Sequence, residues 1–154
     1  MKEIILTMFK RIISSLVILA VFASLSLAKA KDFGPLTIDV PSGWKILRAN
    51  DSTIVISTLD ETKALRVDAG RLDGRTLEEV AQAAAKEMNG TKPRYDKKTG
   101  TYRFRGMLES MYEMNIIVRG FENSDVVVRI FWAADGASIS KKQVESILNS
   151  LRVR

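Results

Sequence analysis

The segment MNIIVRGFENSDVVVRIFWAAD, residues 114–135, limits the fold more than any other part of the chain. Two runs rich in β-branched and aromatic residues flank the turn-forming residues 122–125, which predicts a β-hairpin. If Glu122 pairs with Asp125, then Ile117 lies opposite Ile130. One face carries Ile117, Phe121, Val126, Val128, Ile130 and Trp132, and the other carries Met114, Ile116, Val118, Val127 and Phe131. Because uncovered apolar area stays in contact with water, we expect both faces of this hairpin to be covered.

Two segments with helical periodicity are suited to cover the hairpin. Thr76 and Glu79 form a capping-box pattern at the start of a first helix over residues 77–88, which Asn89-Gly90 ends. Ser140 and Gln143 repeat the pattern before a second helix, which extends to residue 151. The apolar stripes are Leu77, Val80, Ala81, Ala84 and Met88 in the first helix and Val144, Ile147, Leu148 and Leu151 in the second. We predict that the two helices cover opposite faces of the hairpin.

Four short strands are predicted between residues 36 and 72, each separated from the next by turn-forming residues. This spacing favours an antiparallel meander over βαβ units. Trp44 follows the turn at residues 41–43, and we interpret it as a core residue rather than a ligand platform. The predicted fold class is therefore α+β, with an antiparallel sheet of about six or seven strands sandwiched between helices.

The segment between the first helix and the hairpin is less regular. KPRYDKKTG, residues 92–100, is predicted to be a polar loop, and TYRFRG, residues 101–106, resumes a strand. Gly106 is interpreted as the mark of a β-bulge. The pattern does not place a turn within residues 107–113.

Residues 1–30 have the pattern of a cleaved signal peptide. Lys10 and Arg11 precede an apolar run of 16 residues, and Ala28 and Ala30 occupy the −3 and −1 positions of a cleavage site. A permanent membrane anchor would need about 20 apolar residues. We therefore expect a single domain over residues 31–154, periplasmic or secreted, without a transmembrane anchor after removal of the leader. Met8 is an alternative start to Met1.

The leader also accounts for half of the positive net charge. Residues 1–30 carry four basic residues and one acidic residue, so the remainder has a net charge of +3 rather than +6. Such a modest excess argues against nucleic acid as a partner.

The chain contains no histidine and no cysteine. This composition excludes Ser–His–Asp triads, Cys–His dyads, zinc fingers and disulfides. Met107, Met111 and Met114 are a weak sign of a Cu(I) site, because thioethers bind that ion, but methionine is also an adaptable core residue. We expect no cofactor and no catalytic or metal-binding residues.

One cationic segment, residues 92–105, is the candidate for contact with a partner. It contains six cations against Asp96 alone, with two tyrosines between them. The candidate residues are Lys92, Arg94, Tyr95, Lys97, Lys98, Tyr102, Arg103 and Arg105. They suit a protein partner with an acidic face or another anionic surface. The alternative is a solvated loop leading into a charged edge strand.

The order of these patterns resembles the PsbP-like superfamily, whose members are related to an extrinsic subunit of photosystem II and share a fold with a small Ran-binding import factor. The similar stretches are LTIDVPSGWKIL, the segment TLEEVAQAAAKEM, and DVVVRIFWAAD leading into SKKQVESILNSLRV. The resemblance implies an antiparallel sheet between helices and non-catalytic accessory roles. It transfers no functional residue, and the metal-related histidines of the photosystem relative have no counterpart in this chain.

The function expected from the sequence is a non-catalytic, extracytoplasmic binding or accessory domain that assists a protein complex or an envelope process. Two other readings remain open. A small-ligand or metal carrier would require an apolar cavity or three converging methionine sulfurs. An enzyme would require a deep pocket with at least two convergent carboxylates.

Overall fold

The computed structural model describes residues 28–134 and 139–154. Most of the predicted leader, the alternative start Met8 and the end of the segment 114–135 lie outside these residues. The first strands are β1 (Lys29–Phe33), β2 (Leu36–Val40), β3 (Trp44–Ala49), β4 (Thr53–Thr58) and β5 (Ala64–Arg71). Helix α2 (Leu77–Glu87) precedes β6 (Arg94–Asp96), β7 (Thr101–Leu108), β8 (Tyr112–Gly120) and β9 (Val126–Ala133). Helix α3 (Lys141–Ser150) and β10 (Arg152–Val153) follow.

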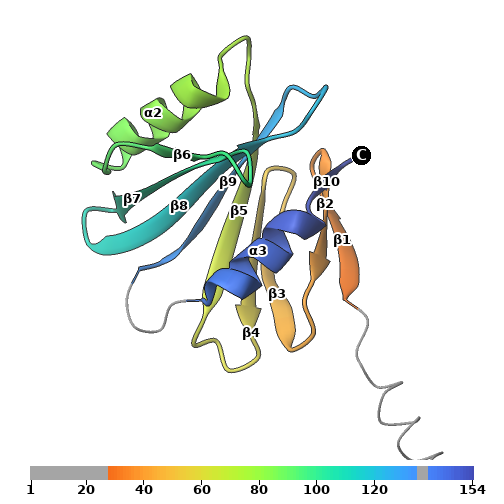
Figure 1. Ribbon diagram of the computed structural model, residues 1–154. Coiled ribbons are helices and arrows are strands. Elements are labelled where there is room, and N and C mark those ends of the chain that lie inside the picture. The colour runs from red at the N-terminus through yellow and green to blue at the C-terminus, as the bar shows by residue number, and fades with distance from the viewer. Residues whose placement is uncertain (1–27, 135–138) are drawn as a thin grey trace, which may run out of the picture.

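A seven-stranded antiparallel sheet forms the centre of the fold. Its strand order is β3-β4-β5-β9-β8-β7-β6, so the predicted hairpin β8–β9 lies inside the sheet (Figure 1). The α+β class and the antiparallel sheet between helices are confirmed.

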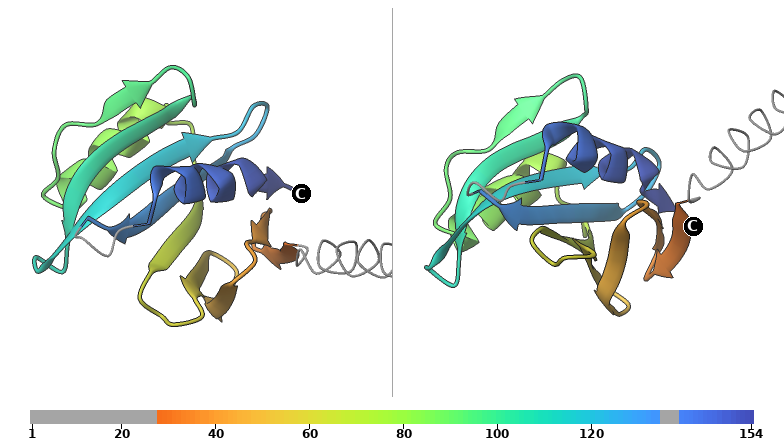
Figure 2. Two further views of the ribbon diagram at one scale, coloured as in Figure 1. Left: turned by 60° about the horizontal axis from the view of Figure 1, so that its bottom comes forward. Right: turned by 90° about the horizontal axis from the view of Figure 1, so that it is seen from below.

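The register of the central hairpin is also confirmed. Asn115 pairs with Trp132 and Ile117 pairs with Ile130. The side chains of the two predicted faces belong to two separate apolar clusters, one with α3 and the other with α2. Figure 2 shows α2 and α3 on opposite sides of the sheet. The alternation of the hairpin therefore accounts for the placement of both helices.

Both helices begin with the predicted capping boxes. Thr76 and Glu79 exchange hydrogen bonds at the start of α2, and Ser140 and Gln143 do so at the start of α3. The Thr76 backbone N–H, followed by its hydroxyl, lowers the pKa of the Glu79 carboxyl by donating hydrogen bonds to it. Because the folded-state pKa is lowered, this stabilisation is present above the ordinary pKa of a glutamate and is lost as the pH falls through the lowered value.

The predicted four-strand meander is wrong at its first strand. Strand β2 does not pair with β3 but lies between β1 and β10 in a separate three-stranded sheet. The turn at residues 41–43 is therefore a corner between two sheets, which the turn chemistry alone does not distinguish from a hairpin. Trp44, at this corner, is partly buried against the apolar cluster beneath α3.

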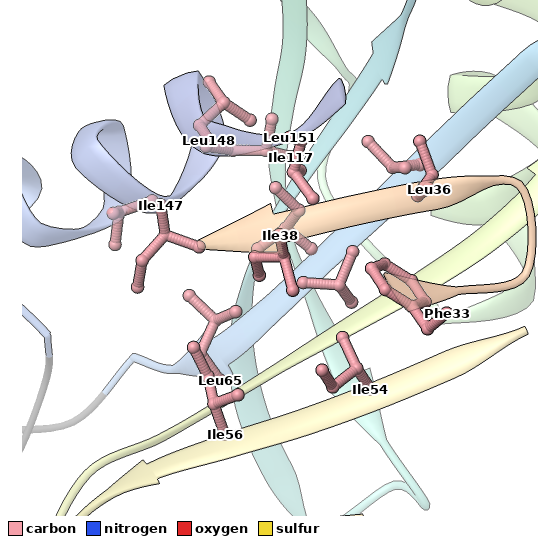
Figure 3. Packing of buried hydrophobic residues seen from close by; sticks show 14 of the residues in the cluster. Phe33, Leu36, Ile38, Ile54, Ile56, Leu65, Ile117, Ile147, Leu148 and Leu151 are labelled. Carbon is pink, nitrogen blue, oxygen red and sulfur yellow. The ribbon is translucent and has the colours of Figure 1, made fainter. Parts of the chain in front are cut away.

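The small sheet and α3 together cover one face of the large sheet. In Figure 3, Leu36 and Ile38 from β2 approach Ile54 and Leu65 of the large sheet, and Ile147 packs nearby from α3. These five side chains are at most 1% exposed. The α3 face of the large sheet is thus a fully buried core, which the small sheet and α3 cover together.

Strand β7 takes part in two hairpins, one with β6 and one with β8, where the sequence predicted a polar loop followed by a strand. The predicted polar loop contains β6, which pairs with β7, and the turn that the sequence did not place is at Glu109 and Ser110, both with positive φ. The predicted bulge at Gly106 is wrong, because β7 and β8 pair in one continuous register from Thr101 to Leu108.

The predicted cleavage point after Ala30 falls inside β1. Ala30 pairs with Asp39, and Lys31 pairs with Ile38. Of the five residues in β1, only Phe33 is buried. In residues 28–134 and 139–154, no helix is long and apolar enough to cross a membrane.

Candidate functional site

The cationic segment lies at a free edge of the large sheet, because β6 is the last strand in the order. Its residues divide between the two sheet faces, since side chains alternate along a strand. Arg94 pairs with Arg103 on the α3 face, in the same cross-strand row as Ile117. Tyr95 pairs with Tyr102 on the opposite face. The tyrosines therefore do not share one surface with the arginines.

The two tyrosines contact each other on the α2 side. Their ring centroids are 5.0 Å apart. Tyr102 packs against the apolar cluster beneath α2. Partial burial, followed by the nearby Glu78, raises the pKa of the Tyr102 hydroxyl. This pair belongs to the packing of the sheet edge.

Four of the six cations line a hollow on the sheet edge. This cationic groove, defined by Lys92, Arg94, Arg103 and Arg105, has a volume of about 620 Å³. Its other lining residues are Thr91, Pro93, Phe104 and Asn115. Four of the eight lining residues are thus positively charged, and none is acidic.

Two of the four groove cations have an acidic neighbour. Arg103 Nε is 3.6 Å from an Asp96 carboxylate oxygen, and an Arg105 terminal nitrogen is 3.6 Å from Glu113. Over the described residues, Lys92 and Arg94 form no ion pair within 4.0 Å. The groove therefore keeps a net positive charge.

One guanidinium nitrogen of Arg103 lacks an acceptor in the described part of the chain. The Arg103 terminal nitrogen Nη2 is buried and has no hydrogen-bond partner among the described residues. A buried donor without an acceptor costs free energy.

Lys97 and Lys98 lie outside the groove, in the exposed turn between β6 and β7. The backbone N–H of Lys98 donates to Asp96, 3.0 Å away. This hydrogen bond is the main cause of the lowered pKa of the Asp96 carboxyl, and Thr99 and Arg103 add to it. The two lysines thus extend the positive surface along the edge without lining the hollow.

A second hollow lies on the opposite face, beside the C-terminal end of α2. This α2-side cavity has a volume of about 290 Å³. Its apolar lining residues are Val55, Ala64, Leu65, Met88, Leu108, Met114 and Phe131, and its charged ones are Arg66, Asp68, Glu87 and Arg129.

The charged residues of the cavity form one connected network. Arg66 Nε is 2.7 Å from Asp68 Oδ1, and Arg129 Nη2 is 3.9 Å from Asp68 Oδ2. The Thr53 hydroxyl also donates to Asp68, over 2.9 Å. Arg129 Nη1 is 3.5 Å from Glu87 at the end of α2.

Phe131 lies beneath both guanidinium groups of this network. The Arg66 and Arg129 guanidinium carbons are 5.7 Å and 5.8 Å from its ring centroid. These distances suit cation–π contact. The ring therefore joins the charged part of the cavity to its apolar part.

The sequence prediction did not include this network, although the sequence contains one sign of it. Arg129 interrupts an otherwise apolar hairpin face, and a charge at such a position needs a partner. The partner is Asp68, which lies directly across from Arg129 on β5.

The three methionines considered as metal ligands do not converge. Met114 pairs with Gly106, and Met107 pairs with Glu113, so the two methionines lie on opposite faces of the sheet. Met111 is exposed at the β7–β8 turn. Nor do the described residues contain a group of three His, Cys, Asp or Glu side chains that could hold a metal ion.

Comparisons with known proteins show a likeness of fold to solved structures. No protein-family model and no curated protein matches the chain. A crystal structure from Bacteroides thetaiotaomicron VPI-5482 is similar, with a TM-score of 0.57 and 16% identity over 84% of this chain and 49% of that one. The chain therefore spans about half the length of that protein.

The solution structure of cyanobacterial PsbP (CyanoP) from Synechocystis sp. PCC 6803 is also similar. The TM-score is 0.46 and the identity is 11%, over 85% of this chain and 96% of that one.

Proposed function

We propose that the protein is a non-catalytic binding or accessory domain that acts outside the cytoplasm and holds the acidic segment of a partner protein in the cationic groove. The observation that carries this proposal is the groove itself. It concentrates four cations on a free sheet edge, and Lys92 and Arg94 have no acidic neighbour within 4.0 Å among the described residues.

The chemistry of the groove favours carboxylates of a protein. Arginine guanidinium groups bind carboxylates through paired, charge-assisted hydrogen bonds, and three of the four groove cations are arginines. Nucleic acid is a weaker match, because the net charge beyond the leader is only +3. The free edge of β6 also offers backbone groups to an extended segment.

Two observations support a non-catalytic role outside the cytoplasm. The chain has no histidine or cysteine, and the two carboxylates at the α2-side cavity, Asp68 and Glu87, are both paired with Arg129. The extracytoplasmic location is supported by the leader pattern of residues 1–30.

Charge reversal in the groove tests the proposal. We expect Lys92→Glu combined with Arg94→Glu to weaken binding of an acidic model peptide by about tenfold or more, since two attractive pairs become repulsive. Binding to the wild type should fall between low and high salt, because exposed charges are screened over about 8–10 Å at physiological ionic strength. Affinity is measured by calorimetry at both salt concentrations, and capture from the native extracytoplasmic fraction follows with the same proteins.

Two matched variants locate the effect. Lys141→Glu with Lys142→Glu changes the net charge equally on exposed residues of α3, so it should retain most of the binding. Lys97→Glu with Lys98→Glu, in the adjacent turn, should slow association without loss of folding. Equal binding by all variants, or binding that ignores salt, would contradict the proposal and leave the segment with a role in solubility.

A further inference from the structure

We propose that the α2-side cavity is a second binding site, which takes a small apolar anion with its negative group beside Arg66 and Arg129. This site is separate from the cationic groove, since it lies on the opposite sheet face and shares none of the groove's lining residues.

The cavity exists because α2 covers only part of its sheet face. The helix contacts β7 and β8 and ends at Glu87. In Figure 1, α2 lies along the β6–β8 side of the sheet, away from β4. Strands β4, β5 and β9 continue past the helix and supply the floor. The α3 face, by contrast, is closed by both α3 and the small sheet.

The apolar part of the cavity suits a compact hydrophobic body. Six of its eleven lining residues place apolar side chains on this face, because Leu65, the seventh apolar residue, packs in the core on the α3 face. Met88 and Met114 are among them, and methionine adapts its shape to irregular ligands. A volume of about 290 Å³ is close to the lower end of ordinary small-molecule sites, which are roughly 300–1,000 Å³.

The charged part of the cavity favours a negative group. Arg66 and Arg129 share one buried carboxylate, Asp68, whose side chain is 10% exposed. Two guanidinium groups around one carboxylate leave a positive charge that only the second acid, Glu87, balances. The side chain of Glu87 is 72% exposed, and its contact with Arg129 is long, at 3.5 Å. Exposed ion pairs contribute little, so a ligand oxygen can replace the Glu87 carboxylate at little cost.

Phe131 supports an aromatic ligand in particular. Its ring is adjacent to both guanidinium groups and belongs to the apolar lining. An aromatic sulfonate or carboxylate matches this arrangement, because its ring meets apolar side chains while its oxygens accept hydrogen bonds from the arginines.

Two dyes with a common aromatic body test the site. 1-Anilinonaphthalene-8-sulfonate is anionic, and N-phenyl-1-naphthylamine is its neutral counterpart. We expect the folded protein to bind one sulfonate per chain, about tenfold more tightly than the neutral amine, because a hydrogen bond to a charged group adds roughly that factor. Fluorescence titration gives both affinities, and amide chemical shifts should change on β5 and β9.

Three substitutions separate the charged and apolar contributions. Arg129→Gln should weaken sulfonate binding by about tenfold and leave the neutral amine unchanged. Arg66→Gln should act in the same direction, and it serves if the first variant does not fold. Ala64→Phe should abolish binding of both dyes, because Ala64 is exposed beside the cavity and a phenyl ring there fills it. Arg105→Gln, in the groove, is the matched control and should change neither affinity.

Three results would overturn the proposal. Equal affinities of the two dyes, in the wild type and in both arginine variants, would make the charged cluster a structural ion network only. Undiminished binding by Ala64→Phe would place the dye elsewhere. Shift changes confined to β6 and β7 would assign it to the groove.

Discussion

The end of helix α2 packs so closely against Gly106 that a larger residue would not fit there. The sequence of strand β7 alone does not indicate this contact. A Cβ atom at this position would lie 2.8 Å from Met88 Cβ and 3.2 Å from the Met88 carbonyl oxygen. The Met107 backbone N–H donates to that same oxygen over 2.7 Å. The sequence identified Gly106 as special but assigned it to a bulge, because the end of α2 is distant in the chain.

Replacement of Gly106 by alanine should therefore be destabilising. We expect Gly106→Ala to lower the free energy of unfolding by about 1–3 kcal/mol, the usual cost of overpacking. Gly70→Ala is the matched control, since its Cβ would meet only a Val127 methyl at 3.8 Å. Urea denaturation of both variants gives the comparison. Equal midpoints would show that the end of α2 does not press on β7.

The charged network of the α2-side cavity was also not predicted, because its residues are brought together by strand pairing. Arg66 and Asp68 belong to one alternating strand, and Arg129 belongs to another that is about 60 residues further along. In the sequence, the first two are the polar positions of an alternating strand, a pattern typical of solvent-facing side chains. Only the pairing of β5 with β9 sets Asp68 against Arg129 and shows that the carboxylate is buried.

At the scale of the elements, the central hairpin and the two helices were predictable because their signals are local. Alternation along β8 and β9 determines the two faces, and the capping boxes begin each helix at the residue indicated by the sequence. Strand β6 was not predictable in the same way. Its three residues Arg94, Tyr95 and Asp96 are polar or half-polar, and they are held in a strand only by β7.

Packing of α3 on the two sheets should contribute a large part of the free energy of unfolding. Leu148 is 1% exposed in the cluster between α3 and the two sheets. We expect Leu148→Ala to cost about 2–5 kcal/mol, because truncation of a buried leucine leaves a cavity. Asn149→Ala, at an exposed position on the same helix, should change the unfolding midpoint little. If the two variants melted alike, α3 would not be docked on the sheet in solution.

The division of the cationic segment also follows from element geometry. Six cations in 14 residues look like one patch in the sequence. The two-residue period of β6 and β7 places the tyrosines on one face and the arginines on the other. The groove could be predicted as a positive region, but its hollow and its separation from the tyrosines depend on the pairing of the two strands.

At the scale of the molecule, cleavage of a leader and export of the remaining chain are predictions. Cleavage after Ala30 would leave Lys31, Asp32 and Phe33 paired with β2 and would remove only exposed residues of β1. The core would be unaffected, because Phe33 is the buried residue of that strand.

Intact mass of the extracytoplasmic form tests this point. We expect a chain that begins at Lys31, because residues 28–30 satisfy the small-residue rule of signal cleavage. N-terminal sequencing supplies an independent reading. A species that retains the apolar run of residues 12–27 would be inconsistent with a cleaved leader.

The position of β2 between β1 and β10 has a consequence for the order of folding. The backbone N–H of Asp39 donates to the Ser150 hydroxyl, 111 positions away, and α3 packs on β2. A chain that emerges from a ribosome or a translocation channel with its N-terminus first cannot cover Leu36 and Ile38 until α3 has followed. Strands β6–β9 with α2 can assemble earlier, from contacts closer in sequence. We therefore expect the α3 face to close only after the C-terminal segment of the chain has emerged.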